Sequence, residues 1–145
     1  MPVEPIPTGH RTVTPYLVVA DAGALIEFLK RAFGAVERHR TDTPDGRVMH
    51  AEVEIGDSIV MLGEAGGEWQ PMPSVLHLYV TDTDAVYARA IEAGATALRE
   101  PEDQFYGDRS GGVQDPAGNQ WWIATHVEDV SPEEMERRMA AQRSG

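Results

Sequence analysis

Residues 47–55 alternate between apolar and polar side chains, a period of two that predicts a β-strand with one buried face. Seven other short segments, rich in β-branched or apolar residues and bounded by turn residues, also predict strands. The eight predicted strands cover residues 12–19, 36–41, 47–55, 58–62, 75–80, 96–100, 110–114 and 120–127. The third predicted strand carries Met49, Ala51, Val53 and Ile55 on its apolar face, and His50, Glu52 and Glu54 on its polar face.

A helical spacing of apolar residues appears twice between these strands. Asp21 is a suitable N-cap for a helix over residues 22–33, and Asp82 or Thr83 caps a second helix that extends to about residue 93. Each of these segments is followed by a Gly-Ala pair, and glycine commonly terminates helices.

The predicted elements follow the order strand, helix, strand, strand, strand, and then repeat it. Residues 16–21 also resemble residues 77–82 in sequence, which indicates that one unit was duplicated. Each unit has a one-faced sheet and a single helix, so each needs the other to complete its buried surface. The sequence therefore predicts an α+β fold in which two βαβββ modules form a curled mixed sheet around a cleft.

This order predicts one domain with an extension at each end. The first eleven residues contain Pro2, Pro5 and Pro7, which predict an extended arm. After the second module, Ser131 is a suitable N-cap for a final short helix, on which Met135 and Met139 form one apolar stripe. The predicted parts are an arm at 1–11, a domain at 12–130 and a helix with a tail at 131–145. Within the domain, module one is 12–64, a linker is 65–73 and module two is 74–130.

Composition narrows the possible functions. The chain of 145 residues has 24 acidic and 12 basic residues, and its formal charge of −12 disfavours binding to nucleic acid or to an anionic membrane surface. It contains no cysteine, which excludes disulfides, thiolate nucleophiles and Cys-based metal sites. No apolar run approaches the ~20 residues that span a bilayer. The first residues lack the basic and apolar regions of a signal peptide, so we expect a cytoplasmic protein.

The strand faces that the helices leave uncovered are expected to form the wall of a concave pocket. An aromatic wall with a few polar groups is typical of a small-molecule site. Strand periodicity, together with the loop before the strand at 110–114, selects the candidate ligand-binding residues. They are Tyr16, His50, Glu54, His77, Tyr79, Tyr106, Arg109, Trp122 and His126.

Structural roles are an alternative for most of these residues. His50 and Glu54 can lie on a solvent-facing sheet surface, which is ordinary for antiparallel sheets. His77 can be a hydrogen-bonded structural histidine, and Arg109 can be an ion-pair strut for its own loop. Trp121 and Trp122 point to opposite faces of their strand, so only one of the two indoles can line a pocket.

Several segments resemble the vicinal oxygen chelate superfamily, which includes glyoxalase I, bleomycin-resistance proteins, fosfomycin-resistance enzymes and extradiol dioxygenases. The detail resembles its PhnB-like branch most. The most specific match is Tyr-Gly-Asp-Arg at 106–109 followed by Asp-Pro-Ala-Gly-Asn at 115–119. Residues 15–19, 31–35 and 46–52 also match, and the resemblance covers about residues 12–130.

The resemblance implies a possible divalent cation (Zn, Ni, Mn or Fe), because enzymes of this superfamily use one to chelate two neighbouring substrate oxygens. They take His or Glu ligands from the first and third strands of unit one and the first and last strands of unit two. Carried over strand by strand, these positions fall near Thr14-Pro15, at Glu54, near Val75 and at Trp122. Trp122 therefore stands where a glutamate ligand is expected.

This departure favours a protein that binds a small aromatic or cationic molecule in a metal-free cleft, since acidic and aromatic side chains attract cations. The alternative is a metal-dependent lyase, isomerase or dioxygenase whose metal is held by His50, Glu54 and His77. A structural protein without any ligand is a third possibility. A homodimer is also expected, because relatives commonly pair and because the proline arm and the last helix offer apolar surface.

Overall fold

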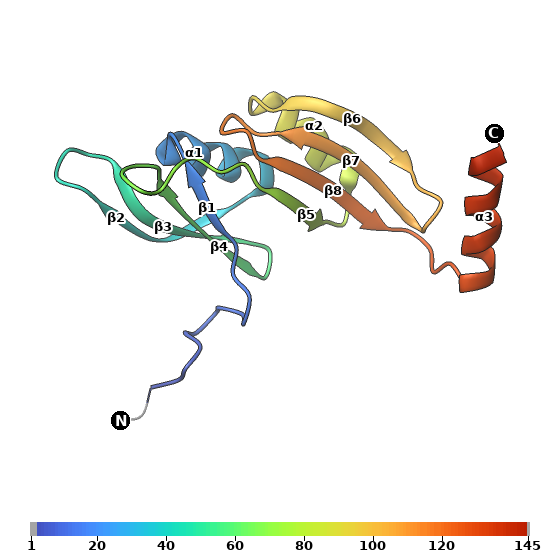
Figure 1. Cartoon of the computed structure of the whole chain (residues 1–145), viewed down its shortest axis with the longest axis horizontal. Coiled ribbons are helices and arrows are strands. Elements are labelled where there is room, and N and C mark those ends of the chain that lie inside the picture. The colour runs from blue at the N-terminus through green and yellow to red at the C-terminus, as the bar shows by residue number, and fades with distance from the viewer. Residues whose placement is uncertain (1–2, 145) are drawn as a thin grey trace.

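A computed structural model describes residues 3–144 and shows two modules of the order βαβββ, followed by one more helix (Figure 1). Module one comprises β1 (Tyr16–Val19), α1 (Ala22–Phe33), β2 (Val36–Asp42), β3 (Val48–Ile55) and β4 (Ser58–Glu64). Module two comprises β5 (Val75–Tyr79), α2 (Thr83–Glu92), β6 (Thr96–Asp103), β7 (Asp108–Gln114) and β8 (Gln120–His126). The last helix is α3 (Pro132–Ser144).

The strands form two four-stranded mixed sheets with the same topology. Their orders are β1-β4-β3-β2 and β5-β8-β7-β6. In each sheet the first strand runs parallel to the last strand of its module, and the other neighbours are antiparallel. The α+β fold of two βαβββ modules is thus confirmed, with two separate sheets where one curled sheet was expected.

Helix α1 has the predicted limits because both of its ends are capped. The Asp21 side chain accepts a hydrogen bond from Ala24 N at 3.0 Å, and Gly34 ends the helix at a φ of 68°. The apolar side of α1 is fully buried, and α1 lies beside α2 (Figure 1). A direct link joins these helices, since Arg89 Nη2 donates to Arg31 O at 3.3 Å. Ala90, Val113, Trp121 and Ile123 of module two belong to the same core cluster as the buried residues of module one.

The predicted apolar face of β3 is wrong at its first position. Met49 is 57 % exposed, whereas its neighbour Val48 is 2 % exposed. The pairing with β2 explains this reversal, because His50 pairs with Thr41 while Val48 pairs with Asp42, which leaves Met49 as an extra residue. Such a β-bulge shifts the alternation by one position and redirects the side chains before it.

The two ends of the chain have few contacts with the domain. Residues 3–15 form no helix or strand, so β1 is shorter than predicted, and Met1, Pro2 and Gly145 lie outside the described residues. Helix α3 starts as predicted, with Ser131 Oγ accepting from Glu134 N at 3.2 Å, and it stands apart from the sheets (Figure 1). No helix among residues 3–144 is both long and apolar enough to cross a membrane.

Candidate functional site

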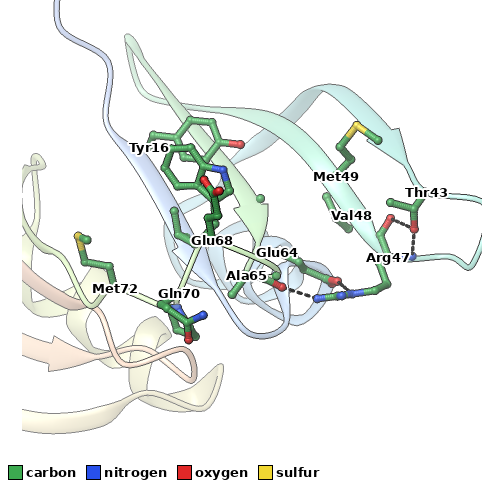
Figure 2. A pocket seen from close by; sticks show the side chains of 15 residues that line it. Tyr16, Thr43, Arg47, Val48, Met49, Glu64, Ala65, Glu68, Gln70 and Met72 are labelled. Carbon is green, nitrogen blue, oxygen red and sulfur yellow. Dashed lines mark hydrogen bonds and ion pairs between the residues drawn. The ribbon is translucent and has the colours of Figure 1, made fainter.

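A cavity of about 930 Å³ opens on the face of the first sheet that α1 does not cover (Figure 2). Its wall combines Tyr16 and Met49 from the sheet with Trp69 and Met72 from the segment that joins the modules. The volume falls in the range of small-molecule sites. The full lining is Tyr16, Val18, Thr43, Arg47, Val48, Met49, Gly63, Glu64, Ala65, Gly66, Glu68, Trp69, Gln70, Pro71 and Met72.

The joining segment, residues 65–73, is fixed to the edge of the first sheet at both ends. Ala65 N donates to Val19 O at 2.8 Å, and Met72 N donates to Val18 O at 3.0 Å. The segment predicted as a linker therefore forms a wall of the cavity. This wall lies along β1, which is the edge strand of the first sheet.

Between these two anchors the segment makes a tight turn that presents an indole. Gly66 and Trp69 exchange two backbone hydrogen bonds of 2.7 and 2.9 Å, and Gly67 takes a φ of 55° inside the turn. A positive φ favours glycine at that position. The turn leaves Trp69 69 % exposed at the cavity, where a ligand ring can stack on it.

The charged residues of the cavity leave one carboxylate without a partner. Arg47 is already engaged, since its Nε donates to Glu64 at 2.8 Å and its Nη2 to Ala65 O at 2.6 Å (Figure 2). Glu68 has no hydrogen bond or ion pair with any residue in the described part of the chain. The cavity therefore carries an uncompensated negative charge at its wall.

A chain of polar contacts starts at Tyr16 and runs away from the cavity along the sheet. The Tyr16 hydroxyl lies 3.4 Å from His50 Nδ1, and His50 Nε2 lies 3.0 Å from Glu52 Oε2. The other carboxylate oxygen of Glu52 lies 2.9 Å from Nε2 of His10, a residue of the N-terminal arm. Hydrogen bonds from His50 and then from His10 lower the pKa of Glu52, so its carboxylate is ionised at neutral pH.

Gly63 on β4 makes the position of the Tyr16 ring possible. A Cβ atom at residue 63 would lie 2.7 Å from the Tyr16 hydroxyl and 2.7 Å from Met49 O. A larger residue would therefore displace the ring from the sheet. Gly63 also lines the cavity, which places the hydroxyl beside the cavity floor.

Glu54, the other acidic candidate in module one, points to a different partner. It forms an ion pair with Arg38 of β2, whose Nε donates to Glu54 at 3.2 Å. Neither residue lines the cavity. Glu54 therefore braces β2 against β3 in this structure.

Three of the candidates in module two form a network of their own. The Tyr79 hydroxyl donates to Asp108 Oδ2 at 2.8 Å, and His126 Nδ1 lies 2.9 Å from Asp108 Oδ1. The buried Asp108 thus holds both side chains, and the His77 ring lies 4.8 Å from the Tyr79 ring. Asp129 and then Asp108 raise the pKa of His126, while the hydrogen bond to Asp108 raises the pKa of Tyr79.

Trp122 lies in the second sheet, and its side chain points to the opposite face from that of the buried Trp121. Its ring lies over Gly112, where a Cβ would be only 2.5 Å away, and the Arg99 guanidinium lies 5.0 Å from the ring centroid. Trp121 is core, and its Nε1 donates to Asp115 at 2.8 Å. The indole of Trp122 therefore packs against its own chain.

The last two candidates lie apart from both networks. Arg109 forms ion pairs with Asp84 of α2 at 2.8 Å and with Asp103 of β6 at 3.2 Å, so it links α2 and β6 to β7 and is not a strut for its own loop alone. The Tyr106 ring contacts Phe105 with a centroid distance of 5.3 Å. Neither of the two lines the cavity.

Of the nine candidates, the structure therefore places only Tyr16 in the cavity wall and joins only His50 to it directly. Sequence reasoning missed Met49, Glu68, Trp69 and Met72. One signal could have revealed Trp69 and Met72, since an exposed-looking tryptophan and methionine in a Gly/Pro-rich segment have no core to fill.

The residues present do not fit the divalent-metal site that the fold family implies. Within residues 3–144, no three His, Cys, Asp or Glu side chains form a group that could hold a metal ion. The alternative trio is not assembled, since His50 contacts Glu52, Glu54 contacts Arg38, and His77 belongs to the other sheet. At the last ligand position Trp122 offers only an indole N–H, which donates and does not ligate.

Comparison with known proteins agrees with this fold. Residues 9–123 match the family model of the Glyoxalase/Bleomycin resistance protein/Dioxygenase superfamily, and the chain belongs to this superfamily. Uncharacterized protein Mb0911c of Mycobacterium bovis is 40 % identical over 144 residues, covering 92 % of this chain and 95 % of that protein. An uncharacterized protein of Mycobacterium tuberculosis, Rv0887c, is also 40 % identical. This match covers 92 % of this chain and 85 % of that protein.

Solved structures show the same architecture at lower identity. TioX from Micromonospora sp. ML1 is 24 % identical, with a TM-score of 0.70 over 81 % of this chain and 99 % of TioX. A glyoxalase/bleomycin resistance protein/dioxygenase family enzyme from Burkholderia phytofirmans PsJN is 19 % identical, with a TM-score of 0.65 over 79 % of this chain and 97 % of that enzyme. At these identities the likeness supports the fold. The PhnB-like branch stays a prediction.

Proposed function

We propose that this protein binds a small cationic aromatic molecule in the cavity of module one, without a metal ion. The observation that carries the proposal is a cavity of about 930 Å³ whose wall joins two aromatic rings to the unpaired carboxylate of Glu68. A ring of the ligand would stack between Tyr16 and Trp69, and its positive charge would face Glu68. Aromatic faces and carboxylates both attract cations.

Methionine side chains extend the range of ligands that this wall can hold. Met49 and Met72 are 57 % and 68 % exposed at the cavity. Their flexible thioethers adapt to flat rings of different outline. The β-bulge in β3 is what turns Met49 outward, so a local irregularity of the sheet supplies part of the wall.

Two probes that share one ring system and differ in charge test the proposal. At neutral pH 9-aminoacridine is a cation, and acridine-9-carboxylate is an anion. Isothermal titration is expected to show about tenfold tighter binding of the cation, the size of one favourable cation–π or ion-pair contact. Equal affinities, or tighter binding of the anion, would contradict the proposal.

Two variants then locate the site. Trp69→Ala is expected to weaken both probes about tenfold or more through lost stacking. Glu68→Gln is expected to weaken only the cation, by a few-fold. Tyr106→Ala and Glu133→Gln serve as matched controls, since Tyr106 lies outside the cavity and Glu133 lies on α3. If a control variant lowers binding as much as its partner variant, the ligand binds elsewhere.

The metal-free part of the proposal has its own test. Metal content is measured on protein purified without chelators or affinity tags, and none of Zn, Ni, Mn or Fe is expected at stoichiometric level. Added divalent metals are also expected to leave the melting temperature unchanged, because a ligand that binds the native state stabilises it. A stoichiometric metal that is lost in His50→Ala would overturn this part and favour the lyase, isomerase or dioxygenase.

A further inference from the structure

The contacts that lead from Glu52 through His50 to Tyr16 have a fixed hydrogen-bond direction. Glu52 sets this direction. An ionised carboxylate only accepts hydrogen bonds. His50 Nε2, at 3.0 Å from Glu52, must therefore carry a hydrogen and donate it. His10 Nε2 approaches the other oxygen at 2.9 Å, so Glu52 is held from two sides.

This donation determines what the other nitrogen of His50 can do. In a neutral imidazole one nitrogen donates and the other accepts. With Nε2 as the donor, Nδ1 of a neutral His50 offers a lone pair to the Tyr16 hydroxyl, 3.4 Å away. The single hydroxyl hydrogen of Tyr16 is then directed at His50, away from the cavity.

The Tyr16 oxygen consequently faces the cavity only as an acceptor. It lies against Gly63, a residue of the cavity lining that has no side chain. His39 does not compete for His50, because their ring centroids are 6.0 Å apart and His39 Nε2 lies 3.0 Å from Thr41 Oγ1.

We propose that Tyr16 determines the specificity of the cavity by accepting a hydrogen bond from an O–H or N–H group attached to the ligand's aromatic ring. His50 and Glu52 are positioning residues that keep the Tyr16 hydrogen turned away. The ligand class is then a phenol, an arylamine or an arylammonium ion, and ethers of the same ring are excluded. This inference rests on the proposed function, since it concerns the same cavity.

A pair of neutral probes tests this inference separately from the charge of the ligand. 2-Naphthol carries an O–H donor, and 2-methoxynaphthalene carries only an acceptor on the same ring. The wild-type protein is expected to bind 2-naphthol about three- to tenfold more tightly, which is the range for one hydrogen bond. In Tyr16→Phe the two affinities are expected to become equal, and the melting temperature shows whether the variant is folded.

His50→Phe and Glu52→Gln test the positioning roles. Without the acceptor at His50, the Tyr16 hydroxyl is free to donate, so the preference for 2-naphthol is expected to disappear although Tyr16 is present. Glu52→Gln offers one carbonyl oxygen to two histidine donors, and the preference is expected to fall as well. In the wild type, ¹⁵N chemical shifts should show His50 protonated at Nε2 and not at Nδ1.

The outcomes separate the two proposals. If both naphthalenes bind the wild type with equal affinity, or if His50 is protonated at Nδ1, the inference about Tyr16 is overturned while the cavity stands. If neither naphthalene nor either acridine binds, both proposals are overturned. If Tyr16→Phe retains the preference for 2-naphthol, another group accepts the hydrogen bond and the assignment to Tyr16 fails.

Discussion

The two modules share one strand order but differ greatly in how much of their surface they bury. Among the described residues, sixteen buried apolar side chains belong to module one and five to module two. Helix α1 buries Leu25, Ile26, Phe28 and Leu29, whereas the buried residues of α2 are only Thr83 and Ala90. Module one therefore supplies most of the core, and it also carries the cavity on its opposite face.

The open faces of the two sheets differ as well. On module one, the contacts of Glu52 and His50 lead to Tyr16 at the cavity. On module two, the contacts of the buried Asp108 lead to Tyr79 and His126, and His126 also pairs with Asp129 at 2.7 Å. A duplicated scaffold can thus concentrate the buried core and the cavity in one copy, while the other copy keeps its polar groups satisfied among themselves.

Assembly of two copies of the chain is the prediction with the largest expected effect. The chain exposes Val3 and Ile6 in its arm and Met139 on α3, and these ends make few contacts with the domain. A homodimer stays the prediction, since a second copy would cover apolar surface that a single chain leaves in water. Sedimentation equilibrium at micromolar concentration is expected to give twice the chain mass of 15.9 kDa. A single species at 15.9 kDa would contradict it.

Apolar residues of the two helices should respond unequally to truncation. Leu29 of α1 is fully buried, so Leu29→Ala is expected to lower the free energy of unfolding by about 3–4 kcal/mol through lost burial and a cavity. Ile91 of α2 is 37 % exposed, so Ile91→Ala is expected to cost less than about 1 kcal/mol. Urea denaturation measures both. Similar losses would show that α2 contributes to the core as much as α1 does.

Periodicity predicted the architecture well because it depends on local patterns. The limits of α1 follow from Asp21 and Gly34, which act within a few residues of the helix ends. Tyr16 and His50 were placed on one face correctly, because their strands are neighbours of β4 and the alternation is regular from residue 50 onward.

The remaining parts depend on contacts between distant segments, which no local pattern encodes. Nothing near Met49 announces a bulge, since the extra residue is defined only by the pairing of β3 with β2. The wall formed by Trp69 depends on how residues 65–73 follow β1, and the partner of Glu54 depends on the register that brings Arg38 beside it. The arm residue His10 reaches Glu52 across 42 positions of sequence.

The turns that precede the last strand of each module should also differ. In module two, the buried Asp115 accepts hydrogen bonds from Ala117 N, Asn119 N and Trp121 Nε1 at 2.8–3.0 Å. Asp115→Ala is expected to cost about 2–3 kcal/mol of stability, because buried donors lose their acceptor.

The matched control for this turn lies in module one. Asp57 is exposed in the turn before β4 and accepts from Ser58 Oγ at 3.0 Å, so Asp57→Ala is expected to change stability by no more than about 0.5 kcal/mol. Both variants are compared with the wild type by urea denaturation. A loss in Asp57→Ala equal to that in Asp115→Ala would remove this difference between the modules.

The smallest expected effects concern the dependence of stability on pH. The contacts of His126 and those of Glu52 should lose their contributions at opposite ends of the pH range. His126 has a raised pKa, so its contacts stabilise the fold fully below the ordinary value of 6.5, and this contribution is lost as pH rises through the raised value. Glu52 has a lowered pKa, so its contribution is present above the ordinary value of 4.5 and is lost as pH falls through the lowered value.

Melting temperatures measured across this pH range for His126→Gln and Glu52→Gln, each subtracted from the wild type, isolate these two contributions. The difference for His126→Gln should shrink on the alkaline side, and the difference for Glu52→Gln should shrink on the acid side. The effect of His126→Gln should be smaller than that of either buried substitution, because the side chain of His126 is about half exposed and solvent screens it. Two differences that shrink on the same side of neutrality would show that the networks do not titrate as their contacts indicate.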